Sequence, residues 1–253
     1  AGTAGINLTG NSLVLDITGG VTGTVALASG RTLRFNPTAG TLAITGVGAA
    51  AFANNAASVM RFSGNVSTDA SFTNGGLTTH DGGDIGMGAS SITFVGNYTR
   101  TAGTFTQTTG TAIMQGVVFT QGPTLSIANL NLNAGAAQAF GTNSMATVTG
   151  TLTVNNTAAG VNGAVIDITP TAATPILTLG AGGNLVYTNG SFDTAMLFGG
   201  AVANLTANAA ADRVIPATVW PATATVNILT VNSAALANDV RLADDRAVVN
   251  ELR

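Results

Sequence analysis

The stretch TVTGTLTV at residues 147–154 decides the fold class of this chain, because threonine alternates in it with apolar or small residues. A period of two is the pattern of a β-strand, in which successive side chains point to opposite faces. Val148, Leu152 and Val154 would then lie on one face, with the threonines on the other. The stretch therefore predicts a half-buried strand.

Short stretches of the same character recur along the chain, each bounded by Gly, Asn, Pro or Ser-Gly. Strands are predicted at Ser12–Ile17, Thr24–Ala28, Thr32–Asn36, Thr41–Thr45, Val59–Phe62, Ser91–Val95, Ala112–Gln115, Leu125–Leu132, Thr147–Val154, Ala164–Thr169, Ile176–Leu179, Asn184–Tyr187, Thr225–Val231 and Arg246–Leu252. Two alanine-rich stretches, Ala49–Ala57 and Ala201–Ala211, have no clear cap pair and are expected to be short helical turns or loops. The chain is predicted to be all-β.

Composition narrows the class of function. Only 8% of the 253 residues are charged, against about 25% in an ordinary globular domain, and all eight basic residues are arginine. Scattered arginines and a net charge of −3 argue against nucleic-acid binding. The absence of cysteine excludes a disulfide scaffold. No apolar run reaches the length of a membrane-spanning helix, so no membrane insertion is expected.

Repetition favours a parallel β-solenoid over a multi-sheet β-sandwich, which is kept as the alternative. Gly-Thr pairs open similar strands at Gly23, Gly40, Gly110 and Gly150. The Leu-rich strand after Ser12 precedes its counterpart at Thr41 by 29 residues, the length of a coil of three short strands. Residues 1–253 are expected to form one elongated domain, with a weak subdivision near 205–215.

Three segments carry a resemblance to a known group of proteins. They are Phe94–Gly116, then Leu130–Asn133, then Val148–Val154, which read FVGNYTRTAGTFTQTTGTAIMQG, LNLN and VTGTLTV. Together they resemble the Thr/Gly/Asn-rich β-strand repeats of secreted bacterial cell-surface proteins, which are adhesins and filaments of the β-solenoid type. The resemblance implies an extracellular location and a structural role, and it supplies no catalytic residues.

The two ends of the chain suggest how such a module would act. The segments at 6–17 and 246–253 are strand-like and have no polar cap. Open strand edges recruit further strands, so we expect copies to stack head to tail into a filament, although loops covering the ends, or a longer parent chain, explain the pattern equally well. The expected interface comprises Ile6, Leu8, Leu13, Val248, Val249 and Leu252. An adhesin stalk that binds a surface glycan or protein is the alternative, and a polysaccharide-active enzyme is a distant third.

The segment HDGGD at 80–84 is the acidic cluster that contains the only histidine. Asp81 and Asp84 are weak candidates for Ca²⁺ ligands, because this ion takes six to eight oxygen ligands. The favoured interpretation is a polar turn between coils. Asp244 and Asp245 are interpreted as a loop pair beside arginines, and no nucleophile triad or phosphate loop is present. The sequence therefore predicts no enzyme and no cofactor.

Two further features have simple interpretations. The threonines from Thr147 to Thr153 resemble an ice-binding array, but that activity needs the same register on successive coils, and rows such as Thr104–Thr109 look irregular. An ordinary solvated strand face is therefore favoured. Trp220, between Pro216 and Pro221, is expected to pack a loop against the core.

Overall fold

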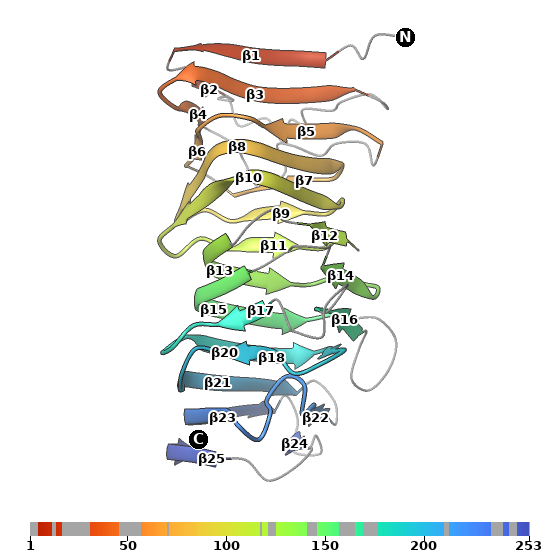
Figure 1. Cartoon of the computed structure of the whole chain (residues 1–253), viewed down its shortest axis with the longest axis vertical. Helices are drawn as coiled ribbons and strands as arrows, with labels where there is room; N and C mark the ends of the chain where they lie inside the picture. The colour runs from red at the N-terminus through yellow and green to blue at the C-terminus, as the bar shows by residue number, and fades with distance from the viewer. Residues whose placement is uncertain are drawn as a thin grey trace.

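The structure is a computed structural model, and it describes residues 5–11, 14–16, 31–45, 57–69, 71–116, 118–120, 125–140, 146–156, 165–168, 177–209, 213–233, 240–242 and 247–252. These residues form strands and turns and no helix. The strands stack in parallel from β1 at one end of an elongated body to β25 at the other (Figure 1). The predicted parallel β-solenoid is confirmed, and the alternative β-sandwich is wrong.

Strands of successive coils build three walls, and the first is named the leucine wall after its inward row. It contains β7 (Phe72–Asn74), β9 (Ile92–Phe94), β11 (Ala112–Met114), β13 (Leu125–Leu132), β15 (Ala146–Asn155), β18 (Asn184–Asn189), β21 (Val202–Ala209), β23 (Thr225–Ser233) and β25 (Ala247–Leu252). Its register places one leucine above the next, at Leu130, Leu152, Leu185, Leu205, Leu229 and Leu252.

The second wall is the aromatic wall. It contains β1 (Gly5–Asn11), β3 (Thr32–Ala39), β5 (Val59–Phe62), β8 (Leu77–Gly88), β10 (Tyr98–Gln107), β12 (Val118–Thr120), β14 (Gln138–Phe140), β16 (Val165–Asp167) and β19 (Ser191–Phe192). The inward side chains of Phe35 and Phe62 lie in one row, with ring centroids 5.2 Å apart. His80 and Arg100 occupy the next two positions of that row.

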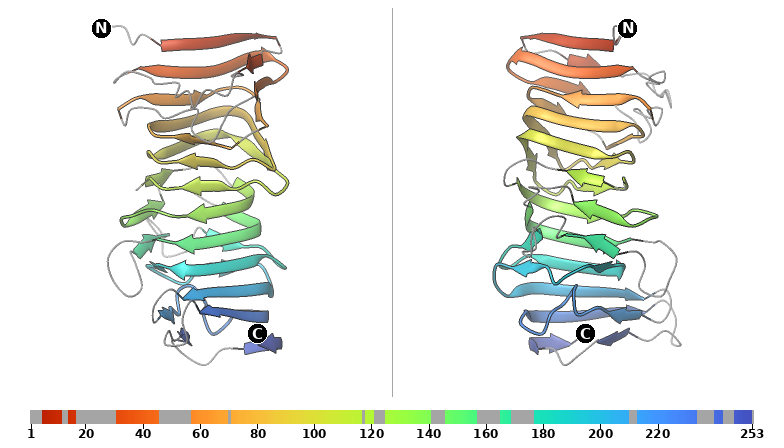
Figure 2. Two further views of the ribbon diagram at one scale, coloured as in Figure 1. Left: turned by 180° about the vertical axis from the view of Figure 1, so that it is seen from behind. Right: turned by 45° about the vertical axis from the view of Figure 1, so that its right-hand side comes forward.

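The third wall is formed partly by strands that bend around a corner. It contains β2 (Val14–Asp16), β4 (Leu42–Thr45), β6 (Val66–Thr68), β17 (Leu177–Leu179) and β20 (Leu197–Phe198), with the later halves of β8 and β10 and the earlier halves of β13 and β15. A separate pair, β22 (Arg213–Ile215) with β24 (Val240–Leu242), follows in the last coils. Figure 2 shows the same stack from two further sides.

Coil length varies along the stack. Val14 pairs with Ala43, an offset of 29 residues that confirms the predicted spacing between these two strands. In the middle of the stack the coils are shorter, because Phe72 pairs with Ile92 and Ile92 with Ala112, each an offset of 20 residues. Shorter coils bring equivalent residues of each 20-residue repeat into contact.

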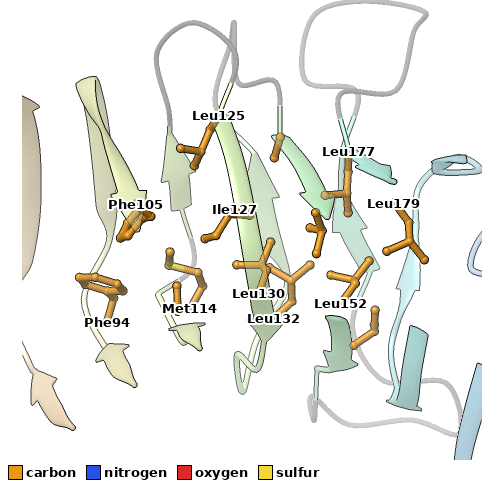
Figure 3. Packing of buried hydrophobic residues seen from close by; sticks show 14 of the residues in the cluster. Phe94, Phe105, Met114, Leu125, Ile127, Leu130, Leu132, Leu152, Leu177 and Leu179 are labelled. Carbon is orange, nitrogen blue, oxygen red and sulfur yellow. The ribbon is translucent and has the colours of Figure 1, made fainter. Parts of the chain in front are cut away.

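The core is a continuous column of apolar side chains between the walls. Figure 3 shows residues such as Phe94, Leu130, Leu152 and Leu179 pointing into it. They belong to one buried cluster that extends from Leu33 to Leu229. Burying apolar area contributes roughly 25 cal/mol per Å², so this column is the main stabilising feature of the fold.

One described region differs from the sequence expectation. Residues 201–211 were expected to be a helical turn or a loop, but β21 covers most of this stretch, because Leu205 and Ala207 continue inward rows of the leucine wall. Ladder pairing thus overrides the helical propensity of alanine. The stretch at 49–57 lies outside the described residues except for Ala57, and so does the predicted strand at 24–28.

Candidate functional site

The predicted polar turn at 80–84 is wrong, because these residues lie within the twelve-residue strand β8, which runs from the aromatic wall to the third wall. The chain changes direction at Gly83, whose φ of +73° is one that glycine adopts without strain. A Cβ on Gly83 would lie 2.1 Å from the backbone of Gly64 in the preceding coil. The glycine therefore permits both the corner and the close contact between coils.

Asp81 is an ion-pair partner on the outside of this corner. Its carboxylate accepts hydrogen bonds from the Arg61 guanidinium and, at 2.6 Å, from the Ser63 hydroxyl. Burial alone would raise the pKa of Asp81, but the bonds from Arg61 and Ser63 outweigh it and lower the pKa. Arg61 supplies the positive charge that a Ca²⁺ ion would otherwise bring.

Asp84 has different partners. Its Oδ1 accepts a hydrogen bond of 2.7 Å from the Thr104 hydroxyl, and its backbone N–H donates to Asn65 Oδ1 over 3.0 Å. Among the described residues, no group of three or more His, Asp or Glu side chains could hold a metal ion. The calcium site at Asp81 and Asp84 stays a prediction, and both carboxylates already stabilise contacts between coils.

A buried polar cluster lies on the inner side of the same corner. The His80 side chain is fully buried, with Nδ1 2.9 Å from the Tyr98 hydroxyl and Nε2 3.3 Å from the Gly83 carbonyl oxygen. Because a carbonyl oxygen only accepts, Nε2 carries the proton and Nδ1 accepts from Tyr98. The rings of Phe62 and Phe105 pack edge-on against the imidazole. Burial lowers the pKa of His80 to about 4, so the imidazole is neutral at pH 7.

Arg100 extends this cluster into the next coil. It is 5% exposed, and its guanidinium donates to the Gly103 carbonyl oxygen, over 2.7 Å from Nε. Gly103 has a φ of +91°, and a Cβ there would lie 2.1 Å from His80 Nε2. The cluster therefore saturates carbonyl groups that the corners of β8 and β10 leave inside the protein. Every described contact of this cluster is with another part of the protein, so the cluster has a structural role.

The outward side of the leucine wall has a very different character. The register aligns one row of eight residues, named here the neutral row: Thr73, Thr93, Ile113, Asn131, Thr153, Val186, Thr206 and Thr230. All eight are half-buried, which is typical of side chains standing close together on a sheet. The row contains no charged and no aromatic residue.

A second row lies two residues earlier in each coil, and its first three members directly precede β7, β9 and β11. It comprises Ser71, Ser91, Thr111, Asn129, Thr151, Asn184, Asn204 and Ile228. Several of these side chains are fixed by hydrogen bonds to the neighbouring coil: Ser91 N–H to Ser71 Oγ at 2.8 Å, Thr151 N–H to Asn129 Oδ1 at 3.1 Å, and Asn204 Nδ2 to Asn184 Oδ1 at 2.8 Å. We call the two rows together the neutral face. The second row continues in register to Glu251 in β25.

A shallow hollow of about 330 Å³ lies partly within the neutral face, because four of its six lining residues belong to the two rows. Hydroxyl and amide side chains line it: Thr108, Thr109, Thr111, Asn129, Thr151 and Thr153. At its edge, Gln107 bridges two coils by donating to the Asn129 carbonyl oxygen and accepting from the Ala128 N–H. The hollow is thus uncharged, and threonine methyl groups line it together with hydroxyl and amide groups.

The sequence interpretation missed the neutral face, because the threonines at 147–153 do not share one wall. Thr147 pairs with Thr178 on the third wall, whereas Thr151 and Thr153 pair with Asn184 and Val186 on the leucine wall. The signal that finds the face is the 20-residue repeat, in which Ser71, Ser91 and Thr111 are equivalent, as are Thr73 and Thr93.

The predicted assembly residues lie at both ends of the stack. Ile6 and Leu8 belong to β1, in register with the buried Leu33 and Phe35. Val248 and Leu252 belong to β25, in register with Val226 and Leu229.

The remaining predicted residues are placed as follows. Val249 is also in β25, and Leu13 lies outside the described residues, as do Asp244 and Asp245. Trp220 is buried in a turn and donates to the Ala224 carbonyl oxygen over 3.0 Å, as expected for a loop packed on the core. In the described part of the chain, no helix is long and apolar enough to cross a membrane.

Comparison with known proteins gives no relative. No protein-family model, no curated protein and no solved structure matches this chain.

Proposed function

We propose that this chain is an extracellular structural protein whose β-solenoid stacks end to end on further copies, forming a filament or fibre of a bacterial surface. The observation that carries the proposal is the inward leucine row, which stays in register up to the last strand, β25. A coil of another copy could extend this row if its strand paired with β25 and placed an apolar residue at the same register position. The location follows from the resemblance of the repeats to bacterial cell-surface proteins.

The order of the walls supports this mode of stacking. From β7 to β20, a strand of the leucine wall is followed by one of the aromatic wall and then by one of the third wall, as in β9, β10 and the later half of β10. In the last coils, β21 and β23 are followed by β22 and β24 of the separate pair. β25 belongs to the leucine wall and β1 to the aromatic wall. A second copy placed beyond β25 would begin with β1, a strand of a different wall, as the chain itself leaves the leucine wall after β21 and after β23.

The chemistry of the two end strands supplies the driving force. Among the described strands, β1 pairs only with β3 and β25 only with β23, so each has one edge of backbone N–H and C=O groups directed away from the stack. Such edges are templates for pairing with another strand. Ile6, Leu8, Val248 and Leu252 occupy register positions of inward rows, so the junction would also bury apolar area.

The proposal is tested by sedimentation and electron microscopy of the purified chain over a range of concentrations. We expect the mass to rise with concentration and filaments to appear. Ile6→Lys with Leu8→Lys should abolish this growth, because each lysine places a charge in an inward row at the junction. The matched control is Asn7→Lys in the same strand, on the opposite face, which should still assemble.

A variant at the other end guards against simple misfolding. Leu252→Lys alone should block growth, and a mixture with the Ile6→Lys, Leu8→Lys chain should stop at short oligomers. Circular dichroism must show that each variant keeps its β-structure. A wild-type chain that stays monomeric at every concentration would overturn the proposal.

A further inference from the structure

The neutral face is a two-dimensional array with fixed spacing in both directions. Neighbouring strands of a sheet lie about 4.8 Å apart, and side chains two residues apart on one strand are separated by about 6.6 Å. The neutral row keeps one residue per strand from Thr73 to Thr230, and no register shift is present within it. The second row adds a parallel line of side chains beside it.

The side chains of this array are stiff and uncharged. Seven of the eight residues in the neutral row are β-branched, as Thr, Val or Ile, and such residues have restricted χ1 angles. The Thr, Val and Ile side chains thus present methyl and hydroxyl groups at fixed positions. In the second row, Asn129 Nδ2 donates to the Gly110 carbonyl oxygen over 3.0 Å and its Oδ1 accepts from the Thr151 N–H, so this amide is engaged within the stack. In the neutral row, Asn131 Oδ1 is buried.

Such an array imposes order on the water above it. Water next to a methyl group has restricted orientations, whereas a hydroxyl or amide fixes a neighbouring water by a hydrogen bond. A charged side chain would hold its own hydration shell, and between β7 and β23 neither row has one. Regular spacing repeats the same local arrangement from coil to coil.

We propose that the neutral face binds the surface of an ice crystal. Water molecules ordered between the two rows would form the layer that is continuous with the ice lattice. Two other occupants fit the chemistry less well. A polysaccharide chain is usually gripped by aromatic platforms, and neither row contains an aromatic residue. A second copy packed side by side would favour an apolar core of contact, whereas this face is rich in hydroxyl and amide groups.

The test is the behaviour of the purified chain in freezing solution. We expect the wild-type chain to slow recrystallisation of fine-grained ice and to be taken up into slowly growing ice rather than left in the liquid. Thr93→Arg with Thr153→Arg places two charges in the neutral row and should reduce both effects to the level of buffer. The inferred activity is independent of end-to-end assembly, so the Ile6→Lys, Leu8→Lys chain should keep it.

The matched control places the same two charges on another wall. Thr79 and Thr99 are half-buried outward threonines on neighbouring strands of the aromatic wall, so Thr79→Arg with Thr99→Arg should leave ice uptake unchanged. A folded wild-type chain without effect on ice would overturn the inference. Two other results would also overturn it, if the wild-type chain is not taken up into ice. One is binding to insoluble chitin or cellulose that the neutral-row variant loses. The other is side-by-side dimerisation in solution that the same variant loses.

Discussion

The leucine wall and the corner between the aromatic and third walls use the same parallel ladder in opposite ways. On the leucine wall, the coils from β9 to β23 repeat the same kinds of residue, mainly apolar inside and uncharged outside. At the corner, each position is specific: His80 faces Tyr98, Arg100 reaches Gly103, and Asp81 binds Arg61. Pairing between parallel strands fixes the positions of the side chains, but it does not determine which residue types occupy them.

This difference predicts where the fold is sensitive. A repeated wall distributes its stability over many equivalent contacts, so one outward residue contributes little. The corner depends on single contacts, in which a buried polar group loses its partner or a glycine loses its space. Substitutions should therefore be costly at the corner and tolerated on the neutral face.

The largest effect is expected for Gly103→Ala. The new Cβ would collide with the His80 ring and with the Gly83 carbonyl oxygen, 2.5 Å away, and alanine disfavours the positive φ. We expect a loss of about 3 kcal/mol in the free energy of unfolding, from the clash and the backbone strain together. Urea denaturation measures it.

Two glycines separate these causes. Gly88 has a positive φ but nothing near its added Cβ, so Gly88→Ala should cost only about 1 kcal/mol. Gly135 has neither feature, and Gly135→Ala should stay within about 0.5 kcal/mol of the wild type. Equal losses in all three variants would contradict the role of the His80 contact.

Acid should weaken the corner through His80. The folded pKa of about 4 lies below the ordinary value of 6.5, so the unfolded chain binds more protons between these pH values. Stability is therefore full above pH 6.5 and falls as the pH drops toward 4, by up to about 3 kcal/mol. Urea midpoints measured at pH 7 and pH 4.5 would show the loss.

The control for this pH effect is His80→Gln, whose amide can donate and accept as the neutral imidazole does but does not titrate. Its stability should be nearly constant between pH 6.5 and 4.5. Asp81, whose pKa is lowered, also loses its contribution on acidification, but mainly below about pH 4. The same pH slope in both chains would show that another group is responsible.

The smallest effect is expected on the neutral face. Thr153→Arg introduces a charge at a half-buried outward position between Asn131 and Val186. Because its long side chain can extend into solvent, we expect the free energy of unfolding to change by no more than about 0.5 kcal/mol. A loss as large as that of Gly103→Ala would show that the neutral face is a structural element rather than a free surface.

Much of the fold was accessible from local patterns. The alternation at Thr147–Val154 indicated a strand because side chains on a strand change faces at every residue, and the 29-residue spacing gave the register of β2 with β4. The strand β21 was missed because alanine favours helices locally, and only its neighbours in the stack make Leu205 and Ala207 inward residues.

Local sequence patterns did not predict the buried cluster around His80 or the neutral face. The segment at 80–84 has the composition of a turn, and its course through β8 depends on the contact of Gly83 with Gly64 in the coil before. Thr73, Thr153 and Thr230 are far apart in sequence, and coils of unequal length hide their common row. The sequence around each of these threonines does not indicate that the three lie in one row.

The sequence by itself determined the class of structure: short half-buried strands, few charges and a repeated inward apolar residue, all properties of a residue and its near neighbours. The tertiary structure decided which residues meet across coils. It placed His80 beside Tyr98 and Gly103, and it aligned the neutral row over eight strands. The physical reason is that register between parallel strands is set by the length of each intervening coil, which no single strand records.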